Sequence, residues 1–253
     1  AGIVSAFLGK KLAYYTKDLI QNHMYVGSYI LLSFLSFMPG VFLFFFKNNV
    51  DVINEVQDKK NIRDIKSILL QPKFLQAITA AAFAYAVMSF LMTATPLSMH
   101  VMENISLKRT GFVLQIHVVA MFLPSLITGN LIKRFGHSKM IYLGVIFFTI
   151  TVFLSAFDQT YFNYMLSLIF LGLGWNFLFI SGTSLVVLTY NKNEKFKVQG
   201  FNDLIVFSTM ALASLSAGIL LNYIGWKMMN FICIPFLILI VLVSIIADKK
   251  SKI

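Results

Sequence analysis

Seven long apolar stretches constrain this sequence more than any other feature. A helix needs about 20 residues to cross a hydrocarbon core of roughly 30 Å. Stretches of about this length cover residues 24–46, 74–99, 110–132, 140–157, 161–190, 204–226 and 228–247. Backbone groups in lipid must be hydrogen-bonded within the protein, and the ten-residue alternation typical of barrel strands does not occur in the sequence. We therefore predict an all-α integral membrane protein, built as a polytopic helical bundle.

The composition excludes most other classes of protein. Hydrophobic residues make up 58% of the 253 residues and charged residues only 12%, against about 45–50% and about a quarter in soluble domains. So few charged side chains cannot cover a water-exposed surface, and disordered or coiled-coil chains need more polar sequence. The net charge of +11 comes from basic residues in short loops, so it reports membrane orientation and not nucleic-acid binding.

The basic residues are distributed unevenly between the two sides of the membrane. Of the 21 Lys and Arg residues, fifteen fall in the alternate loops that begin with 47–73 and end with the C-terminus, and six fall in the opposite set. Basic residues accumulate in cytoplasmic loops. The loop 47–73 and the C-terminus are therefore expected in the cytoplasm.

The polar loop 47–73 divides the chain into two parts. Residues 1–46 contain one full span and a short apolar segment at 1–8, which we interpret as the end of a span whose beginning is missing. Residues 74–253 contain six spans in two groups of three, and the last member of each group is almost purely apolar. If every third helix faces lipid, the others line a cavity. The predicted domains are the end of an N-terminal bundle (1–46), a cytoplasmic central loop (47–73) and a C-terminal six-helix bundle with a short tail (74–253).

One loop has a specific arrangement of glycine and arginine. Residues 129–139 read Gly-Asn-Leu-Ile-Lys-Arg-Phe-Gly-His-Ser-Lys and join two spans. This loop resembles the G-x-x-x-D-R-x-G-R-R signature of the major facilitator superfamily, in the degenerate copy of its C-terminal half. It departs from the signature at Lys133, where the signature has Asp, and at His137 and Ser138, where it has two basic residues. The longer pattern TATPLSMH…GFVLQIHVVAMFLPSLITGNLIKRFG…GLGWNFLFISGT…KVQGFNDLIVF is similar to one uncharacterised branch of bacterial permeases in that superfamily.

The resemblance covers essentially the whole chain. It implies that the chain is a fragment of such a protein, from the end of helix five to the C-terminus. It implies a secondary active transporter of a small solute in the cell (inner) membrane, which works by alternating access with proton or sodium coupling. Such a protein acts as a monomer when complete and needs no cofactor or metal. Its expected partners are the small-molecule substrate, the coupling ion and the lipid bilayer.

His117 lies in the middle of the span 110–132. A histidine in lipid is costly, so its side chain should face a cavity or a partner. It is predicted to bind substrate or to take up a proton in the pH range where imidazole titrates. The alternative is a neutral imidazole that bridges two helices.

A second candidate binding region lies in helix ten of the resemblance, which lines the cavity in this superfamily. It contains Trp175 and Asn176. Asn176, Phe179 and Thr183 fall at i, i+3 and i+7, which places them on one helix face. We predict a substrate platform with an amide for orientation, and the alternative is a packing face with a satisfied Asn. Tyr85, in helix seven of the resemblance, is predicted to reach the same cavity.

A cytoplasmic gate is predicted from the charges at the helix ends. Asn202 and Asp203 precede the span 204–226 and would contact basic loop residues such as Lys133 and Arg134. Such ion pairs break and reform when two bundles rock against each other. The alternative is that Asn202 or Asp203 is an ordinary helix N-cap.

Four residues are candidate hinges. Pro96 and Pro124 interrupt their spans, and each removes a backbone donor and kinks a helix. Gly172 and Gly174 permit close helix approach or local unwinding. The alternative is that all four only shape the static packing.

Two other functions compete with transport. Seven full spans also fit a seven-helix receptor or sensor. A membrane-embedded enzyme is disfavoured because the four histidines lie in separate segments without metal-ligand spacing, and the sequence contains no G-x-S-x-G, Walker or G-x-G-x-x-G motif. We therefore predict that the protein is not an enzyme.

Overall fold

The computed structural model describes residues 2–20, 23, 25–45 and 63–250. It divides into two compact units, Ala1–Asn61 and Ile62–Ile253, which are considered separately. All regular secondary structure in the described residues is helical. This division falls inside the predicted loop 47–73, and most of that loop lies outside the described residues, so the domain boundaries stay a prediction.

The first unit is a pair of helices, α1 (Gly2–Thr16) and α2 (Val26–Phe45). Two side-chain hydrogen bonds join them: Thr16 donates to the Ser28 hydroxyl at 2.9 Å, and Ser28 donates to the Ala13 carbonyl at 3.1 Å. Helix α1 extends well beyond the short apolar segment 1–8, and α2 matches the predicted span 24–46.

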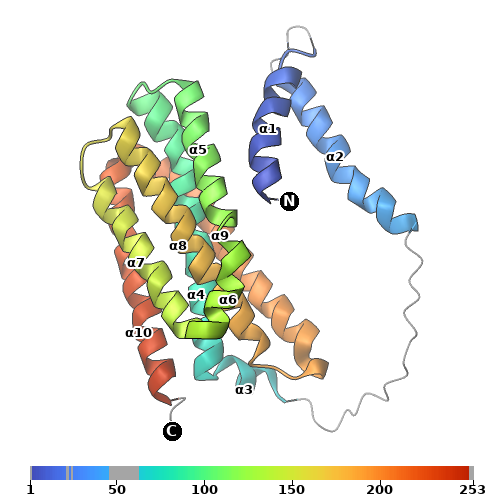
Figure 1. Ribbon diagram of the computed structural model, residues 1–253, viewed down its shortest axis with the longest axis vertical. Coiled ribbons are helices and arrows are strands. Elements are labelled where there is room, and N and C mark those ends of the chain that lie inside the picture. The colour runs from blue at the N-terminus through green and yellow to red at the C-terminus, as the bar shows by residue number, and fades with distance from the viewer. Residues whose placement is uncertain (1, 21–22, 24, 46–62, 251–253) are drawn as a thin grey trace. The chain divides into compact units, whose positions relative to one another are not determined.

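The second unit contains the remaining helices. In chain order they are α3 (Ile65–Leu69), α4 (Pro72–Pro96), the π-helical turn η2 (Leu97–Met102), α5 (Leu107–Phe122), α6 (Ser125–Phe135), α7 (His137–Ser155), α8 (Tyr161–Val187), the short η3 (Lys192–Glu194), α9 (Lys195–Ile232) and α10 (Ile234–Lys250). Figure 1 shows them gathered into one bundle. Six helical stretches of the described chain are long and apolar enough to cross a membrane.

The last of these stretches, Lys192–Lys250, has 59 residues. A straight helix of that length would measure about 90 Å, several times the thickness of a hydrocarbon core. Gly225 breaks it with φ 72° and ψ 171°, a left-handed conformation that favours glycine. Helices α9 and α10 run in opposite directions (Figure 1), so this stretch supplies the two predicted spans 204–226 and 228–247.

Gly136, inside the loop motif 129–139, interrupts the helix in a similar way. It has φ 87° and separates α6 from α7. The motif's second glycine therefore occupies a position where a side chain would be strained. The span predicted at 110–132 lies in one apolar stretch, Leu107–Phe135, which is interrupted at Pro124 between α5 and α6. Pro96 behaves differently, since the helix continues through it into η2.

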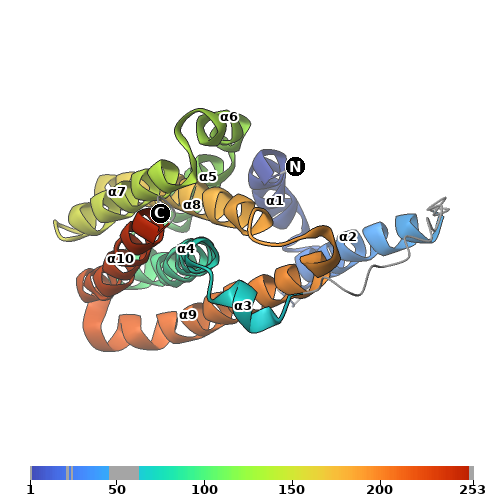
Figure 2. The same ribbon diagram turned by 90° about the horizontal axis from the view of Figure 1, so that it is seen from below.

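Helix α8 packs against α4, α5 and α7, and Figure 2 shows it between them. Glycines make the close approach possible. A Cβ atom on Gly182 would lie 2.7 Å from an α4 backbone oxygen, one on Gly172 would lie 2.7 Å from an α5 backbone oxygen, and one on Gly174 would lie 3.0 Å from an α7 backbone oxygen. The helix is unbroken at these glycines. The core of the bundle is therefore built around α8.

Candidate functional site

Five aromatic side chains meet between four helices of the second unit. We call them the aromatic cluster: Tyr85 from α4, Phe122 from α5, Trp175 and Phe179 from α8, and Phe207 from α9. Trp175 stacks on Phe179 with ring centroids 5.0 Å apart and planes 15° apart. Tyr85 meets both of these rings edge-on, at 4.8 Å from Phe179 and 5.3 Å from Trp175.

The aromatic cluster runs from the interior of the bundle to its surface. Trp175 is only 4% exposed, whereas Phe207 is 51% exposed. Tyr85 and Phe179 are half-buried. The structure thus brings together Tyr85, Trp175 and Phe179, three residues that the sequence singled out. Phe122 and Phe207 were missed, because one phenylalanine among 26 carries no signal by itself.

Asn176 lies next to Trp175 but faces the turn at Pro124. Its amide nitrogen donates to the Met121 carbonyl at 2.6 Å and to the Ser125 hydroxyl at 2.7 Å, and its oxygen accepts from the Thr128 hydroxyl at 2.6 Å. The side chain is fully buried. A buried amide with these partners stabilises the break between α5 and α6. This geometry corresponds to the packing alternative, and a role for Asn176 in substrate binding stays a prediction.

Asn176, Phe179 and Thr183 do not share one environment. Asn176 contacts α5 and α6, whereas the Phe179 ring contacts Tyr85 of α4. The Thr183 hydroxyl donates back to the Phe179 carbonyl at 2.8 Å, within its own helix.

His117 bridges α5 and α8. Its Nδ1 lies 2.7 Å from the Leu168 carbonyl oxygen, and the side chain is fully buried. A carbonyl oxygen only accepts, so Nδ1 carries the proton and Nε2 is left as an acceptor. Nε2 is buried and has no hydrogen-bond partner within the described chain. The structure therefore agrees with the alternative, an imidazole that bridges two helices. One ring nitrogen, Nε2, nevertheless has no partner in the described residues.

The predicted gate residues make no ion pairs to one another within the described chain. Lys133 and Arg134 are exposed at the end of α6, and Asp203 is exposed on α9. Neither the two cations nor Asp203 takes part in an ion pair within residues 63–250. Asn202 donates to the Asp203 carboxylate at 3.1 Å.

The N-cap alternative for Asn202 and Asp203 is wrong. Helix α9 begins at Lys195, about two turns before them. The apolar pattern marks where a span enters lipid, whereas the helix itself starts earlier, at the polar connection that contains Asn191 and Glu194. The side chains of these two residues close a capping box there.

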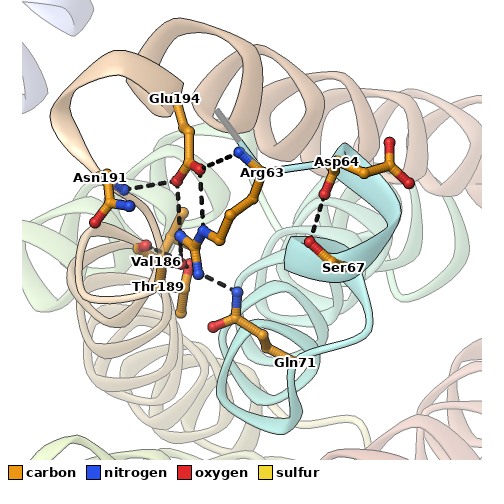
Figure 3. Close-up of polar contacts among 8 residues, drawn as sticks. All are labelled: Arg63, Asp64, Ser67, Gln71, Val186, Thr189, Asn191 and Glu194. Atoms are coloured by element: carbon orange, nitrogen blue, oxygen red, sulfur yellow. Dashed lines mark hydrogen bonds and ion pairs between the residues drawn. The ribbon is translucent and has the colours of Figure 1, made fainter. Parts of the chain in front are cut away.

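A partly buried ion pair that the sequence did not reveal joins Arg63 to Glu194 (Figure 3). Arg63 Nε lies 3.0 Å from Glu194 Oε1, and Nη2 lies 2.7 Å from Oε2. The backbone nitrogens of Arg63 and Asn191 also donate to this carboxylate, at 3.0 and 2.8 Å. Glu194 is only 2% exposed. The side-chain hydrogen bond with Glu194 raises the pKa of Arg63 above its usual value.

The same contact region includes the end of α8. Arg63 Nη2 and Gln71 Nε2 both donate to the Thr189 carbonyl, at 3.0 and 3.3 Å. The segment before α4 is thereby tied to the connection between α8 and α9. In the sequence, Arg63 was only one of several basic residues in the predicted loop 47–73. Glu194 lies 131 positions further along the chain, so no local pattern connects the two residues.

A second polar network involves the loop motif. Asp248, near the end of α10, forms an ion pair with Lys73 at 2.7 Å and accepts from Ser138 at 2.6 Å and from Tyr142 at 3.2 Å. Gln76 donates to Ser138 at 2.9 Å. Where the superfamily signature has an acid, this chain has Lys133, and the acid that contacts the loop comes from α10. In the sequence, the one indication of this contact was the position of Asp248 directly after the apolar stretch 228–247.

A further groove of the bundle lies away from the aromatic cluster. It has a volume of about 520 Å³, opens between α4 and α9, and includes Phe83, Phe90 and Leu212 among its apolar lining residues. Phe83 and Tyr85 are two positions apart, about 200° round the helix. The groove and the aromatic cluster therefore use different faces of α4. Within the described residues no three His, Cys, Asp or Glu side chains are grouped as metal ligands.

Comparison with known proteins decides the family. The family model described as "Major Facilitator Superfamily" matches residues 77–252, which is more than half of the chain. The chain belongs to the major facilitator superfamily. This membership and the apolar helices confirm the predicted family and the predicted fold class, an all-α multi-pass membrane protein.

Several members of the superfamily are similar over long segments. The chain is 37% identical over 255 residues to the riboflavin transporter RfnT of Brucella anthropi. The aligned segment covers 99% of this chain and 63% of that protein. It is 28% identical over 205 residues to the uncharacterised MFS-type transporter YdeG of Bacillus subtilis, 77% of this chain and 47% of that protein. It is 26% identical over 155 residues to the riboflavin transporter RibZ of Clostridioides difficile, 59% of this chain and 34% of that protein. The chain thus spans less than two thirds of the length of these relatives.

Proposed function

We propose that this chain is the C-terminal part of a secondary active transporter that carries riboflavin or a similar planar flavin by alternating access. The observation that carries the substrate proposal is the aromatic cluster, which gathers rings from α4, α5, α8 and α9. A flavin has a flat, fused aromatic ring system, and such rings favour offset stacking or edge-to-face contact with aromatic side chains. The 37% identity with the riboflavin transporter RfnT supports the same substrate.

The mechanism follows from the organisation of the superfamily. Two bundles rock about a site near the middle of the membrane and expose it alternately to each side. In this proposal residues 74–253 supply one wall of the site through the aromatic cluster, and residues 1–46 are the end of the opposite bundle. The C-terminus and the loop 47–73 lie in the cytoplasm, and the protein acts as a monomer in the inner membrane. The family match favours transport over the receptor alternative.

Ion coupling belongs to the same proposal. A proton or sodium gradient drives the cycle, and His117 contacts the substrate or the coupling ion. Its support is the buried Nε2 without a partner in the described chain. An intramembrane ionisable side chain of this kind is a candidate functional group. Lys133, Arg134, Asn202 and Asp203 remain the proposed gate, and Pro96, Pro124, Gly172 and Gly174 the proposed hinges.

The test uses the full-length protein, reconstituted in lipid vesicles in both orientations. Riboflavin flux is followed by its fluorescence, with and without a proton or sodium gradient. We expect riboflavin to be transported, and we expect Phe179→Ala to raise KM about tenfold or more because stacking and apolar contact are both lost. Phe153→Ala is the matched control, since Phe153 is 63% exposed on α7 and lies outside the aromatic cluster. Absence of riboflavin flux in the wild type, or equal effects of both substitutions, would contradict the proposal.

A further inference from the structure

Trp175 is the one member of the aromatic cluster that is almost fully buried and still carries an unsatisfied polar atom. The side chain is 4% exposed, and its indole Nε1 has no hydrogen-bond partner within the described residues. An indole N–H only donates. A buried donor without an acceptor costs free energy, so such a group requires an explanation.

The unsatisfied donor does not result from a lack of polar groups in this region. Asn176, the next residue, is fully buried and makes hydrogen bonds to three partners. The Met121 carbonyl accepts from Asn176, and the Leu168 carbonyl is bonded to His117. These two carbonyls therefore already bond to neighbouring side chains, and the rings of Tyr85, Phe122 and Phe179 contact the Trp175 indole.

The rings around Trp175 contact it in two different geometries. Phe179 lies parallel to the indole, at 15°, and forms a stack with it. Tyr85 and Phe122 instead meet the indole at steep angles, 83° and 72°. They come from α4 and α5, two helices other than the one that carries Trp175. A shift of α4 or α5 relative to α8 during transport would uncover the indole edge and leave its stack on Phe179, which lies on the same helix, intact.

We propose that the Trp175 N–H is the specificity-determining donor of this site and bonds to a ring carbonyl or ring nitrogen of the planar heteroaromatic substrate. This inference rests on the proposed function and adds the chemistry that selects the substrate. Stacking accepts any flat aromatic ring, whereas a buried donor penalises a ring that has no acceptor at its edge. The substrate-free protein keeps the donor unsatisfied, and the correct substrate satisfies it.

The test separates hydrogen bonding from stacking. In the full-length transporter Trp175 is replaced by β-(3-benzothienyl)alanine, which keeps a bicyclic aromatic ring of the same size but has sulfur in place of the N–H group. Trp175→Phe is the second variant. Trp226, the other tryptophan of this chain, is the matched control, because it packs against Tyr164 and lies outside the aromatic cluster. Riboflavin flux and membrane abundance are measured for each protein.

We expect both Trp175 replacements to raise KM for riboflavin about tenfold, which corresponds to about 1.4 kcal/mol, with Vmax and abundance unchanged. The same replacement at Trp226 should leave KM unchanged. If riboflavin is transported and the benzothienyl variant has the wild-type KM, the donor is not used and the inference fails while the proposed function stands. If the wild type does not transport riboflavin, both are overturned.

Discussion

Arg63 and Glu194 form a bidentate ion pair across 131 positions of the sequence, with nitrogen–oxygen distances of 3.0 and 2.7 Å. The pair lies where the chain enters the second unit and where α8 is connected to α9. Four donors converge on the Glu194 carboxylate, three from Arg63 and one from Asn191. This explains how a carboxylate that is 2% exposed remains charged next to the bundle.

Removal of the cation should destabilise the protein. Arg63→Ala leaves the Glu194 carboxylate buried without its counter-ion. Breaking a fully buried pair costs about 3–5 kcal/mol, and we expect about 1–3 kcal/mol because Arg63 itself is 39% exposed and partly screened by solvent. The free energy of unfolding of the purified full-length protein in detergent measures this loss.

A double-mutant cycle is the control for that measurement. Arg63→Ala combined with Glu194→Gln should be less destabilised than the sum of the two single variants, because the second change removes the uncompensated charge. Strict additivity would mean that the two side chains do not stabilise each other.

Asp248 and Asp203 should respond differently to neutralisation. Asp248→Asn loses the ion pair with Lys73 and weakens the bonds to Ser138 and Tyr142. The Asp248 and Lys73 side chains are 28% and 32% exposed, so we expect a loss of about 1 kcal/mol in unfolding free energy. Asp203→Asn should change it by less than about 0.5 kcal/mol. An equal loss for both would refute a special role for the Asp248 network.

His117 offers a substitution that separates structure from coupling. An asparagine amide can replace the Nδ1–H donor to Leu168, but it has no group that titrates. We expect His117→Asn to keep wild-type membrane abundance and to lose the acceleration of riboflavin flux by an imposed proton gradient. His117→Ala should also lose the bond to Leu168. Full gradient-driven flux in the asparagine variant would exclude His117 from proton coupling.

Gly172 should tolerate no side chain. A Cβ atom there would lie 2.7 Å from the His117 carbonyl oxygen and 3.0 Å from the Met121 nitrogen, and both are backbone atoms of α5. We expect Gly172→Ala to cost about 1–3 kcal/mol through overpacking. Gly129→Ala is the helical control, because its Cβ would meet nothing within 4 Å. Thermal unfolding of the two variants provides the comparison, and similar midpoints would contradict the close packing of α5 and α8.

The helices of this protein follow from local properties of the chain. Apolar stretches of sufficient length must form helices in lipid, because every backbone group has to be satisfied within the segment. Gly136 and Gly225 are the two described glycines with a positive φ, and the apolar pattern alone does not predict how the chain reverses at these points. The start of α9 was misplaced for a related reason, since the helix extends from lipid into the polar connection at Lys195.

The sequence by itself therefore determined the class of protein and the family signature, since these depend on hydrophobicity and on residues close together in the chain. It also pointed to Tyr85, Trp175 and Phe179. Only the tertiary structure decided which polar groups have hydrogen-bond or ion-pair partners, and which residues provide them. Helical periodicity fixes the face on which a side chain lies, but not the helix opposite that face. Arg63 with Glu194, Lys73 with Asp248 and the unsatisfied indole of Trp175 are consequences of packing between helices that are distant in sequence.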